Sequence, residues 1–293
     1  MTSAPLPTPL VSTDWLAASL GAPDLVVVDA SWYLPAMNRA ARAEYEAGHI
    51  AGAVYADLEA LSDPTTHLPH MLLAPEALGR EIGMLGIGND CRVVVYDGSG
   101  ANLSAARFWW TLRVLGHDSA AVLDGGLQRW RSEGRPLRAG FAPWAPRQFT
   151  GHFRPELVRS EAEVGRSIAS RSAQLLDARS RGRFEGSEPE PRPGLRGGHL
   201  PGARSLPFAE LIASGGALLP VAELRARFER AGLDLSRPVI ASCGSGVTAC
   251  ALLLGLEAIG HSTHAVYDGS WSEWGRGDGP DVESGPPQEK FPG

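Results

Sequence analysis

The chain has 293 residues, of which 43% are hydrophobic and 20% are charged, and its formal net charge is −6 at pH 7. This composition is typical of a globular protein, the length allows two domains with separate cores, and the acidic balance excludes the basic surface that a nucleic-acid partner requires. Neither an apolar run long enough to span a membrane nor the pattern of a signal peptide occurs. We therefore expect a cytoplasmic protein with no nucleic-acid or membrane partner.

Three cysteines occur, at positions 91, 243 and 250. Their number is odd, no two of them form a CxxC pair, and no histidine lies at a spacing suited to zinc. The sequence therefore predicts no structural disulfide and no metal site. We interpret Cys91 and Cys250 as small buried residues, which is the commonest state of a free cysteine.

Four blocks of the first half recur in the second half, in the same order and at nearly constant separation. The pairs are "LVVVDASWYLP" (25–35) with "QLLDARSRGRF" (174–184), "EAGHIAGAVYADLEAL" (46–61) with "RGGHLPGARSLPFAEL" (196–211), "VVVYDGSG" (93–100) with "VIASCGSG" (239–246), and "AVLDGGLQRW" (121–130) with "AVYDGSWSEW" (265–274). Such a repeat indicates a duplicated domain.

Each half alternates short apolar runs with amphipathic segments, as at 105–116 and 249–260, where Gly260 predicts the end of a helix. This alternation predicts an α/β fold in which helices flank a parallel sheet. We expect a first domain at 1–140, a Pro- and Gly-rich linker at 141–155, a second domain at 156–278 and a mobile tail at 279–293.

The most informative difference between the halves lies after one predicted strand, where Asp97-Gly-Ser-Gly in the first half becomes Cys243-Gly-Ser-Gly in the second. Open α/β sheets bind ligands at the carboxyl ends of their strands. The small residues from Gly244 to Thr248 allow backbone N–H groups at the start of a helix to surround the sulfur. Because such groups stabilise an anion, we expect Cys243 to be a reactive thiolate that can also hold a persulfide.

The segments "CGSGVTA" (243–249), "GGHLPGA" (197–203), "DGGLQRW" (124–130) and "YDGSWSEW" (267–274) resemble the rhodanese superfamily over nearly the whole chain. The resemblance implies two tandem rhodanese-like domains, a sulfurtransferase activity, and no cofactor. Two-domain members carry a non-catalytic first domain and a catalytic second one. Asp97 opposite Cys243 matches that arrangement.

Within the superfamily, the loop after the cysteine distinguishes the sulfur donors. Thiosulfate users place cationic side chains there, whereas Gly244 and Ser245 are neutral and resemble the loop of the 3-mercaptopyruvate sulfurtransferases. The resemblance assigns Arg183 and Arg192 to the carboxylate and ketone of the donor, for which bidentate guanidinium groups are suited. It also places Gly244, Gly246, Val247 and Thr248 at the substrate. Thiosulfate as the preferred donor remains an alternative.

The same branch is assigned a serine, histidine and aspartate relay, which maps onto Ser245, His70 and Glu59. Glu59 departs from the usual aspartate, so Asp57 or Asp63 is an alternative partner for His70. His49 and His199 occupy equivalent positions in both halves, although only one half carries the cysteine. We therefore interpret these two histidines as structural.

Two other functions compete with this interpretation. A cysteine-based phosphatase needs an arginine six residues after the cysteine, and that position is Ala249. A non-enzymatic persulfide relay or binding module would retain the cysteine but has no need of Arg183 and Arg192. We therefore predict transfer of sulfur from 3-mercaptopyruvate, through a Cys243 persulfide, to cyanide or to a thiol such as thioredoxin.

Overall fold

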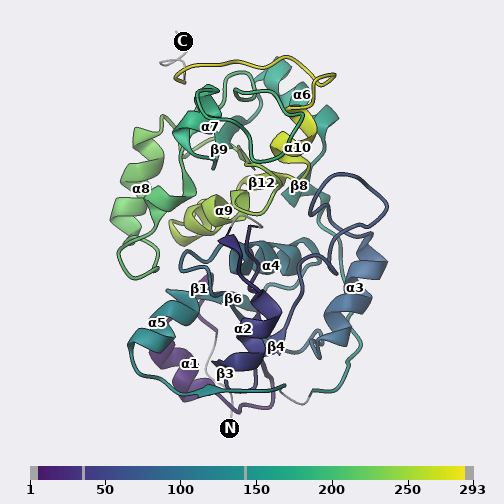
Figure 1. Ribbon diagram of the computed structural model, residues 1–293, viewed down its shortest axis with the longest axis vertical. Helices are drawn as coiled ribbons and strands as arrows, with labels where there is room; N and C mark the ends of the chain where they lie inside the picture. Colours follow the sequence, from purple (N-terminus) through teal and green to yellow (C-terminus); the bar gives the residue numbers. More distant parts are fainter. Residues whose placement is uncertain (1–5, 35–36, 142–143, 288–293) are drawn as a thin grey trace. The chain divides into compact units, whose positions relative to one another are not determined.

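The computed structural model describes residues 6–34, 37–141 and 144–287 (Figure 1). The chain divides into two compact units. Unit 1 comprises residues 1–63, 72–154 and 212–218, and unit 2 comprises residues 64–71, 155–211 and 219–293. Each unit contains a five-stranded sheet, so the predicted α/β class with two repeated domains is confirmed. Segment 64–71 belongs to unit 2, although it lies within the predicted first domain at 1–140. Segment 212–218 belongs to unit 1, although it lies within the predicted second domain at 156–278.

The sheet of unit 1 is parallel throughout and has the strand order β1-β6-β5-β2-β4. Its strands are β1 (Leu10–Val11), β6 (Ala120–Leu123), β5 (Arg92–Tyr96), β2 (Leu25–Asp29) and β4 (Val54–Tyr55). Two further short strands, β3 (His49–Ile50) and β7 (Leu137–Arg138), pair antiparallel. The helices of this unit are α1 (Thr13–Ser19), α2 (Ala41–Ala47), α3 (Pro75–Met84), α4 (Leu103–Val114) and α5 (Gly126–Ser132).

Unit 2 repeats this topology with the parallel order β10-β9-β11-β12-β8. Its strands are β10 (Arg204–Ser205), β9 (Gln174–Asp177), β11 (Val239–Ser242), β12 (His264–Tyr267) and β8 (Val158–Arg159). Its helices are α6 (Glu161–Ser170), α7 (Arg181–Glu185), α8 (Val221–Arg230), α9 (Ala249–Ala258) and α10 (Ser270–Trp274), with 3₁₀ turns η2 (Pro155–Leu157) and η3 (Phe208–Leu211). The described segment 144–154, in the predicted linker, contains no helix or strand.

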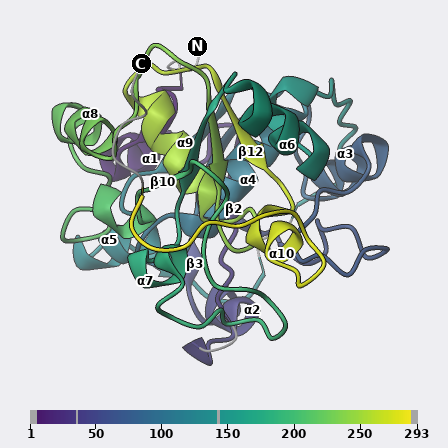
Figure 2. The same ribbon diagram turned by 90° about the horizontal axis from the view of Figure 1, so that it is seen from above.

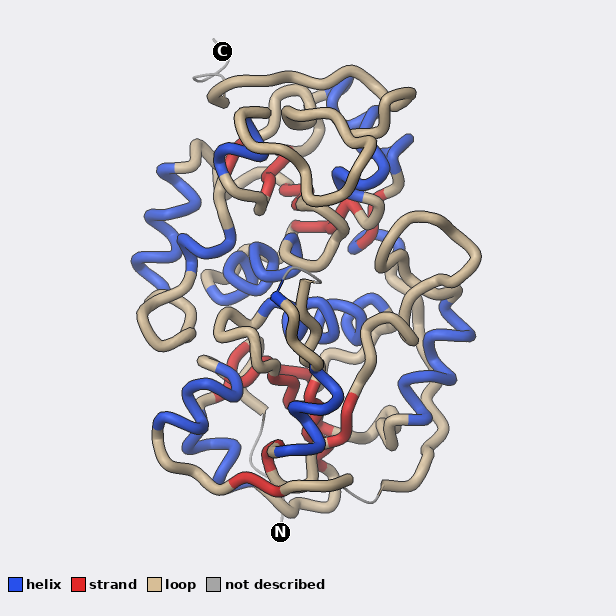
Figure 3. Tube along the Cα trace, viewed as in Figure 1, coloured by secondary structure: helices blue, strands red, loops and turns tan. Residues whose placement is uncertain are grey.

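Helices cover both faces of the sheet in unit 2, which is why strand β11 is buried along its whole length. Helices α8 and α9 lie on one face, and α6 and α10 contribute Val164 and Trp271 to the core on the other. Figure 2 shows α9 and α6 on opposite sides of β12, and Figure 3 shows the strands of each unit among its helices. Parallel strands covered on both faces end at one shared edge, where their loops meet.

The start of the predicted mobile tail is instead hydrogen-bonded to unit 2. Glu283 exchanges two backbone hydrogen bonds with His199, at 2.8 and 3.0 Å, and its carboxylate accepts the N–H of Gly202 at 2.9 Å. The indole of Trp274 donates to the carbonyl of Asp281. Residues 288–293 of that tail lie outside the described residues.

Helix α7 is short, so its position depends on the buried side chain of Phe184. This ring has no exposed surface and stacks on His199 with 3.7 Å between ring centroids. We expect Phe184→Ala to lower the free energy of unfolding by about 3–5 kcal/mol, as truncation of a buried aromatic side chain does. Denaturant unfolding followed by circular dichroism measures this loss. Val221→Ala, at a residue that is 55% exposed, serves as the control and should change stability by less than about 0.5 kcal/mol.

Candidate functional site

Cys243 follows the last residue of β11 directly, at the carboxyl edge of the unit 2 sheet. Its backbone is held on both sides: the N–H donates to Ser270 Oγ at 3.1 Å, and the carbonyl accepts from the N–H of Trp271 at 3.0 Å. The residue is only 1% exposed. The sulfur therefore occupies a fixed position in an environment that excludes most water.

The loop from Gly244 to Thr248 leads into helix α9, whose N-cap is Thr248. Gly246 adopts a φ of +75°, which favours glycine, and its carbonyl accepts a hydrogen bond from the thiol of Cys250 at 3.3 Å. Val247 is buried. In the part of the chain that the structure describes, the backbone N–H groups of Gly244, Ser245 and Val247 donate to no acceptor. These donors lie where an anion on the cysteine sulfur would be stabilised.

The equivalent loop of unit 1 shows such a cradle in use. Asp97 stands where unit 2 has the cysteine and is fully buried. Its carboxylate accepts backbone hydrogen bonds from Ser99 at 2.8 Å and from Ala105, at the start of α4, at 2.9 Å. The hydroxyls of Ser99 and Ser104 add bonds of 2.6 and 3.2 Å. The loop and helix start of this fold thus surround an acceptor with hydrogen-bond donors at the position that Cys243 occupies.

Two guanidinium groups converge on the residue after the cysteine. Gly244 leaves room for them, because a Cβ atom at this position would lie 3.0 Å from Arg183 Nη2 and 3.8 Å from Arg192 Nη1. Arg183 belongs to α7, whose N-cap Ser180 accepts the Arg183 N–H, and Arg192 belongs to the loop between α7 and β10. The structure therefore brings together the cysteine loop and both of the arginines that the sequence analysis assigned to the donor.

Ser245 and His70 also meet, although 175 residues separate them in the chain. His70 Nδ1 lies 2.9 Å from Ser245 Oγ, and both residues are buried. His70 belongs to the segment 64–71 that is part of unit 2, and it adopts a φ of 60°. The hydroxyl next to the loop amides is therefore held by an imidazole that can exchange a proton with it.

The acidic members of the predicted relay lie in unit 1. The carboxylate of Glu59 accepts a hydrogen bond from Trp32 Nε1 at 2.9 Å, and Asp57 accepts the N–H of Glu59 at 3.0 Å. Neither contact selects between Glu59, Asp57 and Asp63 as the partner of His70. Their assignment to the relay stays a prediction.

A group of buried ion pairs beside the arginines was missed by the sequence analysis. Arg179 donates to Asp177 and, at 2.7 Å, to Glu190, and Glu190 in turn accepts from Arg183 at 2.6 Å. Burial alone would lower the pKa of Arg179, but the two carboxylates outweigh it and raise that pKa above its ordinary value. The guanidinium also lies over the ring of Trp271 at 4.2 Å. The one signal in the sequence was Glu190 itself, two residues before Arg192.

The remaining cysteines and histidines of the sequence analysis have local structural contacts. Cys91 is buried and accepts hydrogen bonds from Gly88 N–H and Arg147 Nη1. His49 and His199 are each 1% exposed and bond a carbonyl through Nδ1 at 2.9 Å. Burial lowers the pKa of His199 below its ordinary value. These contacts fit the structural roles expected for them.

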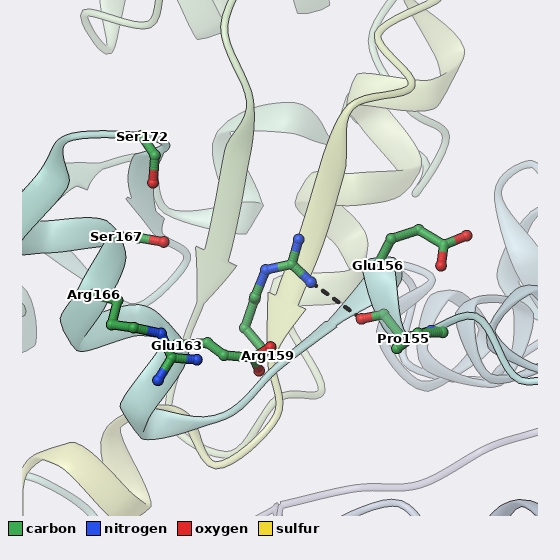
Figure 4. A pocket seen from close by; sticks show the side chains of 7 residues that line it. All are labelled: Pro155, Glu156, Arg159, Glu163, Arg166, Ser167 and Ser172. Carbon is green, nitrogen blue, oxygen red and sulfur yellow. Dashed lines mark hydrogen bonds between the residues drawn. The ribbon is translucent and has the colours of Figure 1, made fainter.

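A cavity of about 390 Å³ lies in unit 2 next to Arg192. It is lined by Thr66, His67, Leu68, Pro69, Arg192, Pro193, Gly194, Leu195, Ser272 and Arg276. Ser272 also bonds the carbonyl of Gly244 at 2.6 Å, so the cavity adjoins the cysteine loop. A separate hollow beside α6 contains none of the predicted site residues, and its Arg159 is bonded to the carbonyl of Pro155 (Figure 4). The described residues include no group of three His, Cys, Asp or Glu side chains placed to hold a metal ion.

The family model for the rhodanese-like domain matches residues 12–133 and 160–276. The chain belongs to the rhodanese family. A mitochondrial thiosulfate/3-mercaptopyruvate sulfurtransferase of Arabidopsis thaliana is 44% identical over 91% of this chain and 76% of its own length. The human 3-mercaptopyruvate sulfurtransferase is 41% identical, with 94% of each chain covered. The crystal structure of SseA from Escherichia coli, described with the rhodanese fold and mechanism of 3-mercaptopyruvate sulfotransferases, covers 90% of this chain and 99% of its own, at a TM-score of 0.81 and 40% identity.

The two rhodanese loops should respond differently to truncation of the side chain that each one surrounds. We expect Asp97→Ala to lower the free energy of unfolding by about 3 kcal/mol, because four donors lose a buried acceptor. Cys243→Ala should cost about 1 kcal/mol, since no hydrogen bond to its sulfur is present among the described residues. Denaturant unfolding of both variants tests this. Equal losses would contradict the view that the unit 1 loop is organised around its carboxylate.

Proposed function

We propose that this protein is a sulfurtransferase that takes sulfur from 3-mercaptopyruvate and carries it as a persulfide on Cys243. One observation carries the proposal: two guanidinium groups converge on Gly244, directly beside a buried cysteine. An α-keto acid presents a planar carboxylate that arginine can bind with two parallel hydrogen bonds. The names of the Arabidopsis and human relatives support the same donor.

In the first step, the Cys243 thiolate attacks the sulfur of the bound donor. A new S–S bond forms, the S–C bond of the donor breaks, and its electron pair passes to the enolate of pyruvate. A proton then converts the enolate to pyruvate, while the transferred sulfur stays on Cys243 as a persulfide. Splitting the transfer through a covalent intermediate gives ping-pong kinetics.

Each site residue has a proposed role in this step. Arg183 and Arg192 hold the carboxylate and ketone of the donor, which places its sulfur against Cys243. Ser245, with His70 at 2.9 Å, donates a hydrogen bond to the oxygen on which charge develops and can deliver the proton. The N–H groups of the loop that contains Gly244, Gly246, Val247 and Thr248 stabilise the persulfide anion.

In the second step, an acceptor thiolate or cyanide attacks the outer sulfur of the persulfide and releases the Cys243 thiolate. The S–S bond breaks and its electron pair returns to Cys243, so the step needs no cofactor.

Thioredoxin is the acceptor that we propose, and the cytoplasm is the proposed location. No helix of the described residues is long and apolar enough to cross a membrane.

Thiosulfate is the second candidate donor, because the name of the Arabidopsis relative includes it. Attack on its outer sulfur would release sulfite and leave the same persulfide. A persulfide relay without donor chemistry is distinguished from both, since it would release neither pyruvate nor sulfite. Comparing kcat/KM for the two donors decides between them.

The persulfide is directly observable. Incubation with 3-mercaptopyruvate alone should add one sulfur to the peptide that contains Cys243, as measured by mass spectrometry, with release of one pyruvate. Cys243→Ser should abolish both, because the hydroxyl is a far weaker nucleophile than a thiolate. Cys250→Ser, at the buried cysteine of α9, serves as the control and should retain the modification. Turnover without any added sulfur on Cys243 would contradict the mechanism.

The arginines should matter for donor binding. We expect Arg183→Ala and Arg192→Ala each to lower kcat/KM for 3-mercaptopyruvate by roughly 10- to 100-fold, the loss typical of a hydrogen bond to a charged group. Steady-state kinetics of pyruvate release measures this. Arg181→Ala is the matched control, because Arg181 lies on the same helix and pairs with Glu210 at the surface. Unchanged kinetics in either site variant would remove that arginine from the donor site.

A further inference from the structure

Four charged side chains alternate in sign and lead into the site of unit 2. Asp177 pairs with Arg179 at 2.7 Å, Arg179 with Glu190 at 2.7 Å, and Glu190 with Arg183 at 2.6 Å. The side chains of the first three are 0%, 0% and 2% exposed, whereas that of Arg183 is 21% exposed. Arg183 is therefore the end of the series that reaches the substrate side.

The contacts of Arg183 show how closely Glu190 approaches the site. Both Nε and Nη2 of Arg183 donate to the Glu190 carboxylate. Nη2 is also the atom that lies nearest the Cβ position of Gly244. Only Arg183 thus stands between the carboxylate of Glu190 and the proposed binding position of the sulfur donor. The surroundings have low exposure, so charges there are only weakly screened.

The repeated structure supplies a comparison within the molecule. In unit 1, Asp29 occupies the place of Asp177, and the N–H of Ser31 bonds its carboxylate at 2.9 Å as the N–H of Arg179 bonds Asp177. Ser31 therefore stands where unit 2 has Arg179. The fold does not itself require a buried arginine at this point. The buried arginine and its ion pairs are found in unit 2, which is the unit that carries the cysteine.

We propose that Glu190 determines which sulfur donor the site prefers, by cancelling the charge of Arg183. This inference rests on the proposed function and names a specificity residue for it. Arg183 and Arg192 bring two positive charges to the site, and the carboxylate of Glu190 offsets one of them. The carboxylate of 3-mercaptopyruvate has one negative charge and thiosulfate has two. A negative group beside the site therefore disfavours thiosulfate more strongly.

The test is the ratio of kcat/KM for thiosulfate to kcat/KM for 3-mercaptopyruvate in the variant Glu190→Gln. We expect this ratio to rise on the order of tenfold, the effect of one unit of charge near a partly buried site. Because both constants come from one preparation, the ratio does not depend on the fraction of folded enzyme. Glu188→Gln is the matched control, since Glu188 lies on the same loop, is exposed, and its carboxylate accepts a hydrogen bond from the surface hydroxyl of Ser180. Its ratio should stay within about twofold of wild type, because exposed charges are screened.

A second variant separates charge from geometry. Glu190→Asp shortens the side chain but keeps its charge, so both constants should fall while their ratio stays near the wild-type value. If Glu190→Gln does not fold, Arg179→Ser is added to it, which gives position 179 the serine that unit 1 carries there as Ser31. That double variant should still raise the ratio, because Arg183 loses the carboxylate that pairs with it, but by less than Glu190→Gln alone, because the positive charge of Arg179 is removed as well.

The outcomes distinguish this inference from the proposed function. An unchanged ratio in Glu190→Gln, or an equal rise in Glu188→Gln or Glu190→Asp, would overturn the role of Glu190 and leave the sulfurtransferase mechanism intact. If the wild-type protein forms no persulfide with either donor, the proposed function and this inference fail together.

Discussion

The fold and the site both depend on the loop that connects the end of a strand to the start of the next helix. At that point several backbone N–H groups lie close together with no partner inside the helix, and they favour a negative charge in front of them. In unit 1 the carboxylate of Asp97 occupies this position and accepts two backbone N–H groups. Unit 2 places Cys243 there, and among the described residues the N–H groups of Gly244, Ser245 and Val247 in its loop donate to no acceptor. One local geometry thus stabilises the fold in one unit and prepares chemistry in the other.

The surroundings of the cysteine combine burial with fixed positive charge. Arg183 and Arg192 approach Gly244, which is small enough to let two guanidinium groups come close to the loop. Guanidinium groups suit a small planar anion better than ammonium groups would, because their N–H donors have a fixed planar geometry. The buried pair of Arg179 and Glu190 holds one of them in place. A charge that must be buried is tolerated here because each member of the series has an opposite partner.

Duplication makes the functional residues of unit 2 easier to recognise. Both units keep the sheet order and the buried histidines, and these shared features serve stability. The differences lie at the carboxyl edge of the sheet, where Asp97 is replaced by Cys243 and Ser31 by Arg179. Features present in only one copy of a repeated fold are those that the fold can do without, so they point to function.

Much of this protein was determined by the sequence alone. The repeat, the parallel sheets and the position of Cys243 at a strand end follow from hydrophobic periodicity and from the Gly-rich loop, which are local properties. The resemblance to a family selected Arg183 and Arg192. It also named Ser245 and His70, and the tertiary structure showed the hydrogen bond between them. Only the tertiary structure revealed the contact of Glu190 with Arg179, because such pairs depend on which loops fold against each other. A charged residue in a polar loop carries no sign of burial in its sequence, and its partners are decided only when the loop packs against the sheet.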